Sequence, residues 1–197
     1  MNKLIIITGI SGSGKTTLAR YLNQTIQNSI LLSLDQVKES VADTIGFKNT
    51  QQKENLHKLS NQFFTSLLEE SMKRKDETII IEYPFSIEWK SAFQNFSQKY
   101  NYNVITINSI VDDFDENWDR IIKRDFSDER HPSHERNEYN PLYKNQYEKV
   151  QNMDYYKLKE ENDTKEYHQI NLGTIIEFRN ENKQSLEEIR KKIEEQK

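Results

Sequence analysis

Apolar positions along the chain gather in short runs that alternate with longer stretches of helical periodicity. Runs of strand length lie at residues 3–8, 29–34, 78–81, 104–107 and 167–172, and residues 174–178 add an edge strand. The other stretches predict helices at 15–27, 36–45, 51–74, 86–99, 113–126, 141–161 and 185–195. Strands that alternate with helices pair in parallel through right-handed crossovers. The pattern therefore predicts an α/β fold, a three-layer sandwich around a five-stranded, mostly parallel sheet.

Three stretches add detail to this pattern. The helix at 51–74 carries an apolar stripe, formed by Leu56, Leu59, Phe63, Phe64, Leu67 and Leu68. Tyrosines at 139, 143 and 147 recur at helical spacing, which is typical of core packing; a face that lines a ligand pocket is the alternative. Residues 127–137 have no apolar periodicity and predict a surface loop.

The segment between the first strand and the first helix reads GISGSGKT at residues 9–16, the G-x-x-x-x-G-K-[ST] phosphate-binding loop. Its glycines allow backbone angles at which successive N–H groups surround a phosphate, and the following helix adds its positive end. In this motif Lys15 reaches the β- and γ-phosphates, and Thr16 offers a hydroxyl to Mg²⁺. A Gly-Ser turn without a ligand is the alternative. The candidate nucleotide-binding residues are Gly9, Ser11, Gly12, Ser13, Gly14, Lys15, Thr16 and Thr17.

Composition narrows the class of protein. The 197 residues suffice for one domain, and three of the five glycines lie in the phosphate loop. There is no cysteine, which excludes disulfides, thiolate metal sites and a cysteine nucleophile. The formal net charge of -4 disfavours a long nucleic-acid partner. No run approaches membrane-spanning length and no secretory leader is visible, so we expect a cytoplasmic protein with no membrane partner.

Two acidic residues follow predicted strands: Asp35 comes after the second, and Glu82 ends the third. In parallel α/β sheets the ligand crevice lies beyond the carboxyl ends of the strands, so both acids are expected beside the phosphate loop. Asp35 either orients or deprotonates an acceptor hydroxyl, or it caps the helix that begins at Gln36. Glu82 either binds the acceptor, or a water on Mg²⁺, or is only solvated.

The remaining motifs separate the classes of phosphate-loop protein. A GTPase needs a D-x-x-G after a strand and an N-K-x-D for guanine, and the nearest match, NKQS at residues 182–185, lacks the aspartate. An arginine-bearing region is more informative, because Arg120 and Arg124 lie one helical turn apart, just ahead of RHPSH at residues 130–134. This region favours a small phosphoryl-transfer enzyme.

With the phosphate loop, Asp35 and the sequence IIIE at residues 79–82, the arginine region makes most of the chain resemble a group of P-loop kinases. The group contains the zeta toxins and chloramphenicol phosphotransferases, AAA-domain small-molecule kinases close to the adenylate-kinase-like and polynucleotide-kinase-like enzymes. The phosphate loop is the most specific part of this resemblance, and RHPSH is less specific. The resemblance implies ATP and Mg²⁺ as cofactors.

The resemblance also implies roles for single residues. Arg124 and Arg130 would neutralise charge that develops on the transferred phosphoryl group. Arg120 would lie against the adenine ring; for either helical arginine, an ion pair with a neighbour such as Glu116 is the alternative. The acceptor would be bound by Asp35, Glu82, His131 and His134, although the two histidines would instead stabilise their own loop in a second interpretation. Arg136 receives no role.

The sequence as a whole predicts one P-loop kinase domain over residues 1–197, with a helical acceptor-side insertion at about 36–75 and a lid at about 127–140. We expect an ATP-dependent kinase that transfers the γ-phosphoryl group to a hydroxyl of a small molecule. Two alternatives stay open: a nucleotide or polynucleotide 5′-end kinase, and a nucleotide-binding regulatory or toxin-like protein that acts on a protein partner. No motif identifies the acceptor or the oligomeric state.

Overall fold

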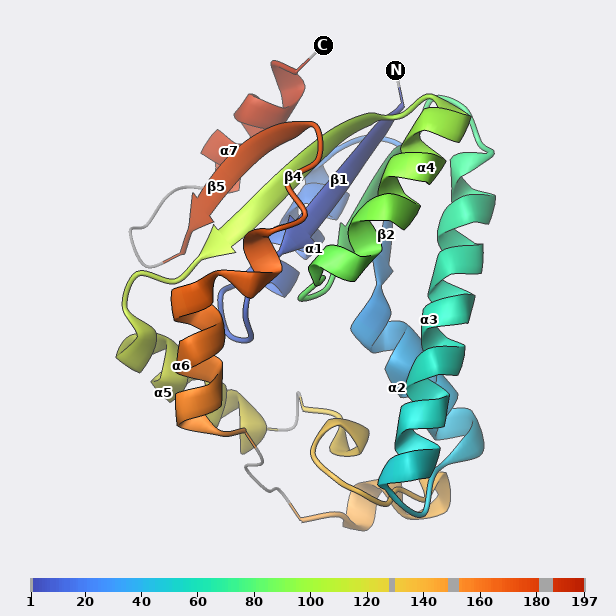
Figure 1. The fold of residues 1–197 in the computed structure, drawn as a ribbon, viewed down its shortest axis with the longest axis vertical. Helices are drawn as coiled ribbons and strands as arrows, with labels where there is room; N and C mark the ends of the chain where they lie inside the picture. Colours follow the sequence, from blue (N-terminus) through green and yellow to red (C-terminus); the bar gives the residue numbers. More distant parts are fainter. Residues whose placement is uncertain (1, 128–129, 149–152, 181–185, 197) are drawn as a thin grey trace.

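A five-stranded parallel sheet forms the centre of the molecule (Figure 1). The computed structural model describes residues 2–127, 130–148, 153–180 and 186–196. The strands are β1 (Lys3–Thr8), β2 (Ser29–Ser33), β3 (Thr78–Glu82), β4 (Asn103–Ile110) and β5 (Thr174–Arg179). Their order across the sheet is β2-β3-β1-β4-β5, and every pairing is parallel. The predicted fold class is confirmed.

Helices cover both faces of this sheet. They are α1 (Lys15–Thr25), α2 (Leu34–Ile45), α3 (Thr50–Met72), α4 (Lys90–Tyr100), α5 (Phe114–Asp125), α6 (Tyr155–Thr164) and α7 (Leu186–Glu194), with 3₁₀ turns at Ile87–Trp89, Pro132–His134, Pro141–Gln146 and Glu166–His168. Alternate residues of β1 point to opposite faces: Ile6 packs with α3 and α4, and Ile7 packs with α1 and α7. Within the described residues, none of the helices is both long and apolar enough to cross a membrane.

The predicted strand at 167–172 is wrong, and the predicted edge strand at 174–178 is the fifth strand of the sheet. Residues 166–168 form a 3₁₀ turn instead. The hydroxyl of Thr106, on β4, accepts from the N–H of Leu172 at 3.1 Å and donates to its carbonyl at 2.8 Å. Leu172 thus packs against the core without strand pairing, because a side chain satisfies its backbone groups.

The predicted helix at 141–161 is confirmed only in its last part, which belongs to α6, and residues 149–152 of it lie outside the described residues. Residues 141–146 form a 3₁₀ turn capped by Asn140, and α6 begins only at Tyr155, capped by the side chain of Asp154. Tyr139 does not stack on a helical ladder: it is buried, and its backbone forms an antiparallel bridge with Phe47, more than ninety residues earlier in the chain. The core interpretation of the tyrosines therefore holds for residue 139, whereas the side chain at 143 is exposed.

Only part of the apolar stripe predicted on α3 is buried in the structure. Phe64 is fully buried, and its ring contacts the rings of Phe85 and Trp89 with centroids 5.9 and 5.7 Å away. The side chain of Phe63, one residue earlier, is 48% exposed. Adjacent residues of a helix lie about 100° apart around its axis, so only part of this wide stripe faces the sheet.

This division predicts unequal effects for two matched substitutions. Phe64→Ala empties a core site that aromatic rings surround and should lower the free energy of unfolding by about 3–5 kcal/mol. Phe63→Ala removes a ring that solvent already reaches, and should lower it by about 1 kcal/mol or less. Urea unfolding followed by circular dichroism measures both, and equal losses for the two variants would contradict the orientation of α3.

Candidate functional site

The phosphate loop, residues 9–16, connects β1 to α1 and has a backbone that depends on its glycines. The φ angles of Gly9, Gly12 and Gly14 are +141°, +79° and +93°, which side-chain-bearing residues rarely adopt. A Cβ at Gly9 would lie 2.5 Å from the carbonyl oxygen of Ser109, and one at Gly12 would lie 2.5 Å from Oδ1 of Asn117. The loop therefore packs directly on β4 and on α5.

Side chains from these two elements also hold the loop by hydrogen bonds. Ser109 Oγ donates to the carbonyl of Ser13 at 2.7 Å, and Asn117 Nδ2 donates to the carbonyl of Ser11 at 3.0 Å. Arg124 Nη2 donates to the hydroxyl of Ser11 at 3.0 Å. Side chains of β4 and α5 thus bind the carbonyls of the loop. The first turn of α1 retains N–H groups that have no partner within the helix and can bind an anion.

Lys15 and two acidic residues form the charged centre of the site. The side chain of Lys15 is buried, and its Nζ donates to the carbonyl of Ile10 at 2.5 Å. Burial lowers the pKa of Lys15 to about 8, although the charges of Glu82 and Asp35 oppose this shift. Burial raises the pKa of Glu82, and the charge of Lys15 opposes that shift. The structure brings together the residues that the sequence predicted at the strand ends.

The hydroxyl of Thr16 donates to Glu82 Oε2 at 3.1 Å, across the gap between α1 and the end of β3. Glu82 is 2% exposed, so the interpretation of a solvated strand-end acid is wrong. A hydroxyl and a carboxylate side by side are the hard oxygen donors that Mg²⁺ prefers. These two residues therefore fit a magnesium ion.

Asp35 lies in the first turn of α2, just beyond β2. The N-cap of this helix is Ser33, one residue before the helix starts at Leu34, so the interpretation of Asp35 as the cap is wrong. Among the described residues the Asp35 carboxylate has no hydrogen-bond partner; its charge raises the pKa of Lys15 and of Glu82. Asp35 thus contributes its charge to the centre, while no hydrogen bond to a described residue engages its carboxylate.

The three predicted arginines have different surroundings. Arg124 contacts the loop at Ser11, as described above, and burial lowers its pKa. Arg120 Nη1 lies 3.7 Å from Glu116 Oε1, which is the same-helix ion pair considered as the alternative. Arg130 Nε lies 3.3 Å from Glu135 Oε1 and 3.7 Å from a carboxylate oxygen of Asp125. Arg124 therefore contacts the phosphate loop directly.

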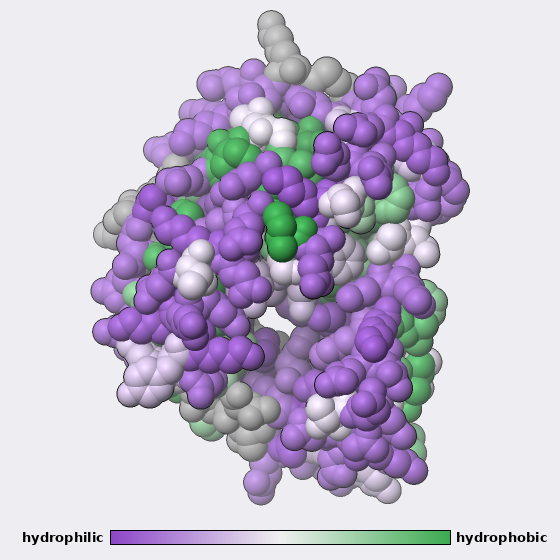
Figure 2. Space-filling view, viewed as in Figure 1, coloured by the Kyte–Doolittle hydropathy of each residue, from purple (hydrophilic) through white to green (hydrophobic). Residues whose placement is uncertain are grey.

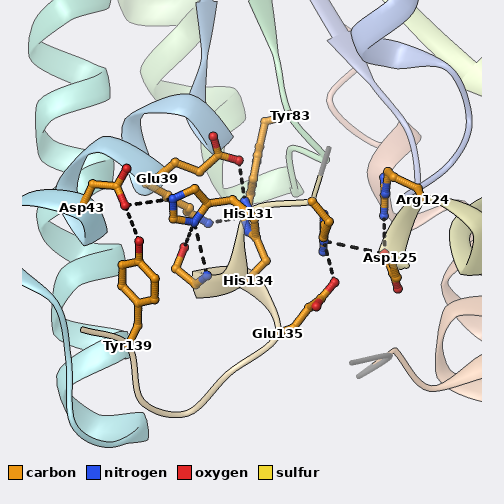
Figure 3. Close-up of polar contacts among 12 residues, drawn as sticks. Glu39, Asp43, Tyr83, Arg124, Asp125, His131, His134, Glu135 and Tyr139 are labelled. Atoms are coloured by element: carbon orange, nitrogen blue, oxygen red, sulfur yellow. Dashed lines mark hydrogen bonds and ion pairs between the residues drawn. The ribbon is translucent and has the colours of Figure 1, made fainter. Parts of the chain in front are cut away.

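The predicted surface loop at 127–137 belongs to the segment that we call the lid, residues 130–140 as the structure describes it (Figure 3). His131 is 9% exposed and its Nε2 lies 3.0 Å from Asp43 Oδ1, while His134 Nε2 lies 2.8 Å from Glu39 Oε1. The hydroxyl of Tyr139 also donates to Asp43. Since their partners are acids of α2, the structure favours the interpretation in which the histidines stabilise their own loop. The prediction of a loop on the surface is wrong for His131, whose side chain is buried.

A lysine of α3 holds the backbone of the same segment. Lys53 Nζ donates to the carbonyls of His134 and Arg136 at 3.0 and 2.8 Å. The guanidinium of Arg136 lies 4.7 Å from the ring centroid of Tyr147. Together with the bridge between Phe47 and Tyr139, these contacts attach the lid to α2 and α3.

The elements around the site enclose an opening. In Figure 1, α5 and α6 lie on one side of it, α2 and α3 lie on the other, and the lid lies below. Figure 2, drawn from the same side, shows that side chains leave this opening unfilled and that mostly hydrophilic residues surround it. A small molecule thus has a path between the lid and the carboxyl ends of the strands.

Sequence reasoning gave no individual role to four residues of this region. Ser109 and Asn117 hold the phosphate loop, but a serine on a strand and an asparagine on a helix carry no motif. Lys38 donates a hydrogen bond to the hydroxyl of Tyr83. Two signals pointed to this pair: Lys38 stands one helical turn after Asp35, and Tyr83 directly follows the acid that ends the third strand.

Known proteins share this fold. A family model described as an AAA domain matches residues 4–138. A candidate kinase from Chloroflexus aurantiacus superimposes with a TM-score of 0.68 at 16% identity, covering 98% of this chain and 94% of the other. The tunicamycin resistance protein of Deinococcus radiodurans superimposes with a TM-score of 0.58 at 13% identity, again covering 98% and 94%. No curated protein matches the chain in sequence.

The two structural likenesses, at these identities, show a shared fold. The family match is stronger, because it spans well over half of the chain, including the phosphate loop, both strand-end acids and the arginine region. The chain therefore belongs to the AAA-domain family, and its motifs resemble those of the P-loop kinases.

Proposed function

We propose that this protein is a kinase that transfers the γ-phosphoryl group of ATP to a hydroxyl of a small molecule. One observation carries the proposal: the phosphate loop, with Lys15 and Arg124 beside it, faces the carboxylates of Glu82 and Asp35 at the ends of neighbouring strands. Cationic and N–H groups suit the phosphates, and a carboxylate suits the incoming hydroxyl. Both kinds of group meet at one edge of the sheet.

In this mechanism the protein positions the reactants and stabilises charge. The loop N–H groups and Lys15 bind the β- and γ-phosphates, and Arg124 adds a second positive charge from α5. Thr16 and Glu82 would hold Mg²⁺, which neutralises charge on the phosphate oxygens when it is bound. No group of three or more metal-binding side chains occurs in the described ranges, and Mg²⁺ in such sites is held largely by the phosphates themselves.

Asp35 would accept the proton of the acceptor hydroxyl or fix its orientation. Its carboxylate has the freedom for this role, since no hydrogen bond to a described residue occupies it. The lid would close the site and exclude water, which suppresses hydrolysis of ATP. In the proposal Arg130 and Arg120 keep their predicted roles at the phosphoryl group and the adenine, and the protein works in the cytoplasm.

The lowered pKa of Lys15 predicts that nucleotide binding takes up a proton. At pH 8 about half of the free protein carries neutral Lys15, and triphosphate binding favours the ammonium form, so about half a proton should enter per Mg·ATP bound. At pH 6.5 Lys15 is already charged and the uptake should nearly vanish. Calorimetric titration in two buffers of different ionisation enthalpy measures it.

The matched control is Lys15→Arg, which keeps the positive charge but cannot lose a proton near pH 8. Its binding should be weaker and free of proton uptake. Uptake that persists in this variant would come from another group and contradict the account of Lys15. If the Lys15→Ala variant still turned over ATP at the original rate, the proposed function itself would be contradicted.

The variant Asp35→Asn should slow phosphoryl transfer without weakening nucleotide binding. The amide is nearly the same size but cannot accept the proton, so kcat should fall by about 100-fold or more. The Kd for Mg·ATP should change by less than about threefold, because the carboxylate faces the acceptor. Acceptor-stimulated ADP release, with acceptors from a metabolite screen, gives the rate; the exposed Asp163→Asn serves as the control. Loss of nucleotide binding instead would mean that Asp35 has a structural or metal role.

A further inference from the structure

Three basic side chains that the proposed transfer does not use lie between the charged centre and the lid. Lys38 is on α2, and Lys53 and His57 are one turn apart on α3. Lys38 Nζ lies 4.3 Å from the ring centroid of Tyr83 and donates to its hydroxyl. In Figure 3 Tyr83 extends from the end of β3 toward the lid, so this lysine is held at the acceptor side of the opening.

The positive charge of this group is not balanced by neighbouring acids. His57 has no hydrogen-bond partner among the described residues, and its pKa is lowered to about 4 by burial and by the charges of Lys38, Lys53 and His134. Asp35 is the acid that opposes this shift. The other acids nearby are engaged: Glu39 with His134, Asp43 with His131 and Lys144, and Glu135 with Arg130.

The three side chains also keep donors for a ligand. An ammonium has three N–H groups. Lys38 directs one of them to Tyr83, and Lys53 directs two to lid carbonyls. Within the described part of the chain, this leaves two donors on Lys38, one on Lys53 and the imidazole of His57. Partly buried donors with a positive potential around them are the features of an anion site.

The spacing relates this site to the reacting hydroxyl. Asp35 and Lys38 stand three residues apart on α2, so they share a face of the helix and are separated by about 4.5 Å along its axis. A single small molecule can therefore place its hydroxyl at Asp35 and a second group at Lys38. We propose that the phosphoryl acceptor carries an anionic group, a phosphate monoester or a carboxylate, that binds between Lys38, Lys53 and His57. That the bound molecule is a phosphoryl acceptor rests on the proposed kinase function, whereas the anion site rests on the contacts of these three side chains.

A titration with simple anions tests the proposal. The protein is first saturated with Mg²⁺ and a non-hydrolysable ATP analogue, so that the phosphate loop is filled. Inorganic phosphate is then added in one arm and succinate in the other, at pH 6, where His57 is neutral in the free protein. We expect at least one anion to bind and to protonate His57, seen as a shift of its ring resonances in NMR spectra. The arm that binds more tightly identifies the charged group of the acceptor.

Two variants complete the test. Lys38→Met should weaken anion binding at least tenfold while the affinity for the ATP analogue stays unchanged, and Lys58→Met, an exposed lysine one residue beyond His57, should leave both unchanged. A folded protein that binds the analogue but shows no response of His57 to either anion overturns the anion site and leaves the kinase proposal standing. If the analogue does not bind, the titration is made on Lys15→Ala alone; a His57 response there supports the anion site while the kinase proposal fails.

Discussion

The close packing of the phosphate loop on β4 and α5 is the constraint on which the site depends. Ser109 and Asn117 occupy the space that side chains would need at Gly9 and Gly12, and they also bind carbonyls of the loop. A loop held in this way has little conformational freedom left to lose when an anion binds, which favours binding. The same contact ties α5 to the loop, and with it the position of Arg124.

Burial of unlike charges beside this loop gives the site its electrostatic character. Isolated in an apolar interior, a lysine or a carboxylate would lose its charge. Lys15 and Glu82 each reduce the burial cost of the other, yet the pKa of Lys15 still falls and that of Glu82 still rises. The two charges therefore offset each other's cost of burial only in part. The charges of a bound phosphate and metal ion would offset the remainder. Functional sites commonly retain such strain at some cost in stability.

The lid and the helices α2 and α3 form one polar assembly on the other side of the opening. His131 and His134 reach acids of α2, and Lys53 reaches carbonyls of the lid. Arg130 connects the same segment to α5, because its Nε lies 3.7 Å from a carboxylate oxygen of Asp125. In the proposed function, the residues that would bind the acceptor and those that would close the site are thereby connected, as substrate-induced closure requires.

The sequence by itself determined the elements whose signals are local. Hydrophobic periodicity marked the first four strands, and residues 9–16 marked the phosphate loop, because both report backbone preferences over a few residues. Tertiary structure alone decided the rest. Tyrosine spacing around residue 139 matched a helix, but pairing with Phe47 imposed an extended bridge there. Residues 167–172 are apolar enough for a strand, yet a hydroxyl on β4 binds their backbone. The acid that His131 meets lies 88 residues earlier; such a partner depends on which polar groups need one after burial, and no neighbouring residue signals it.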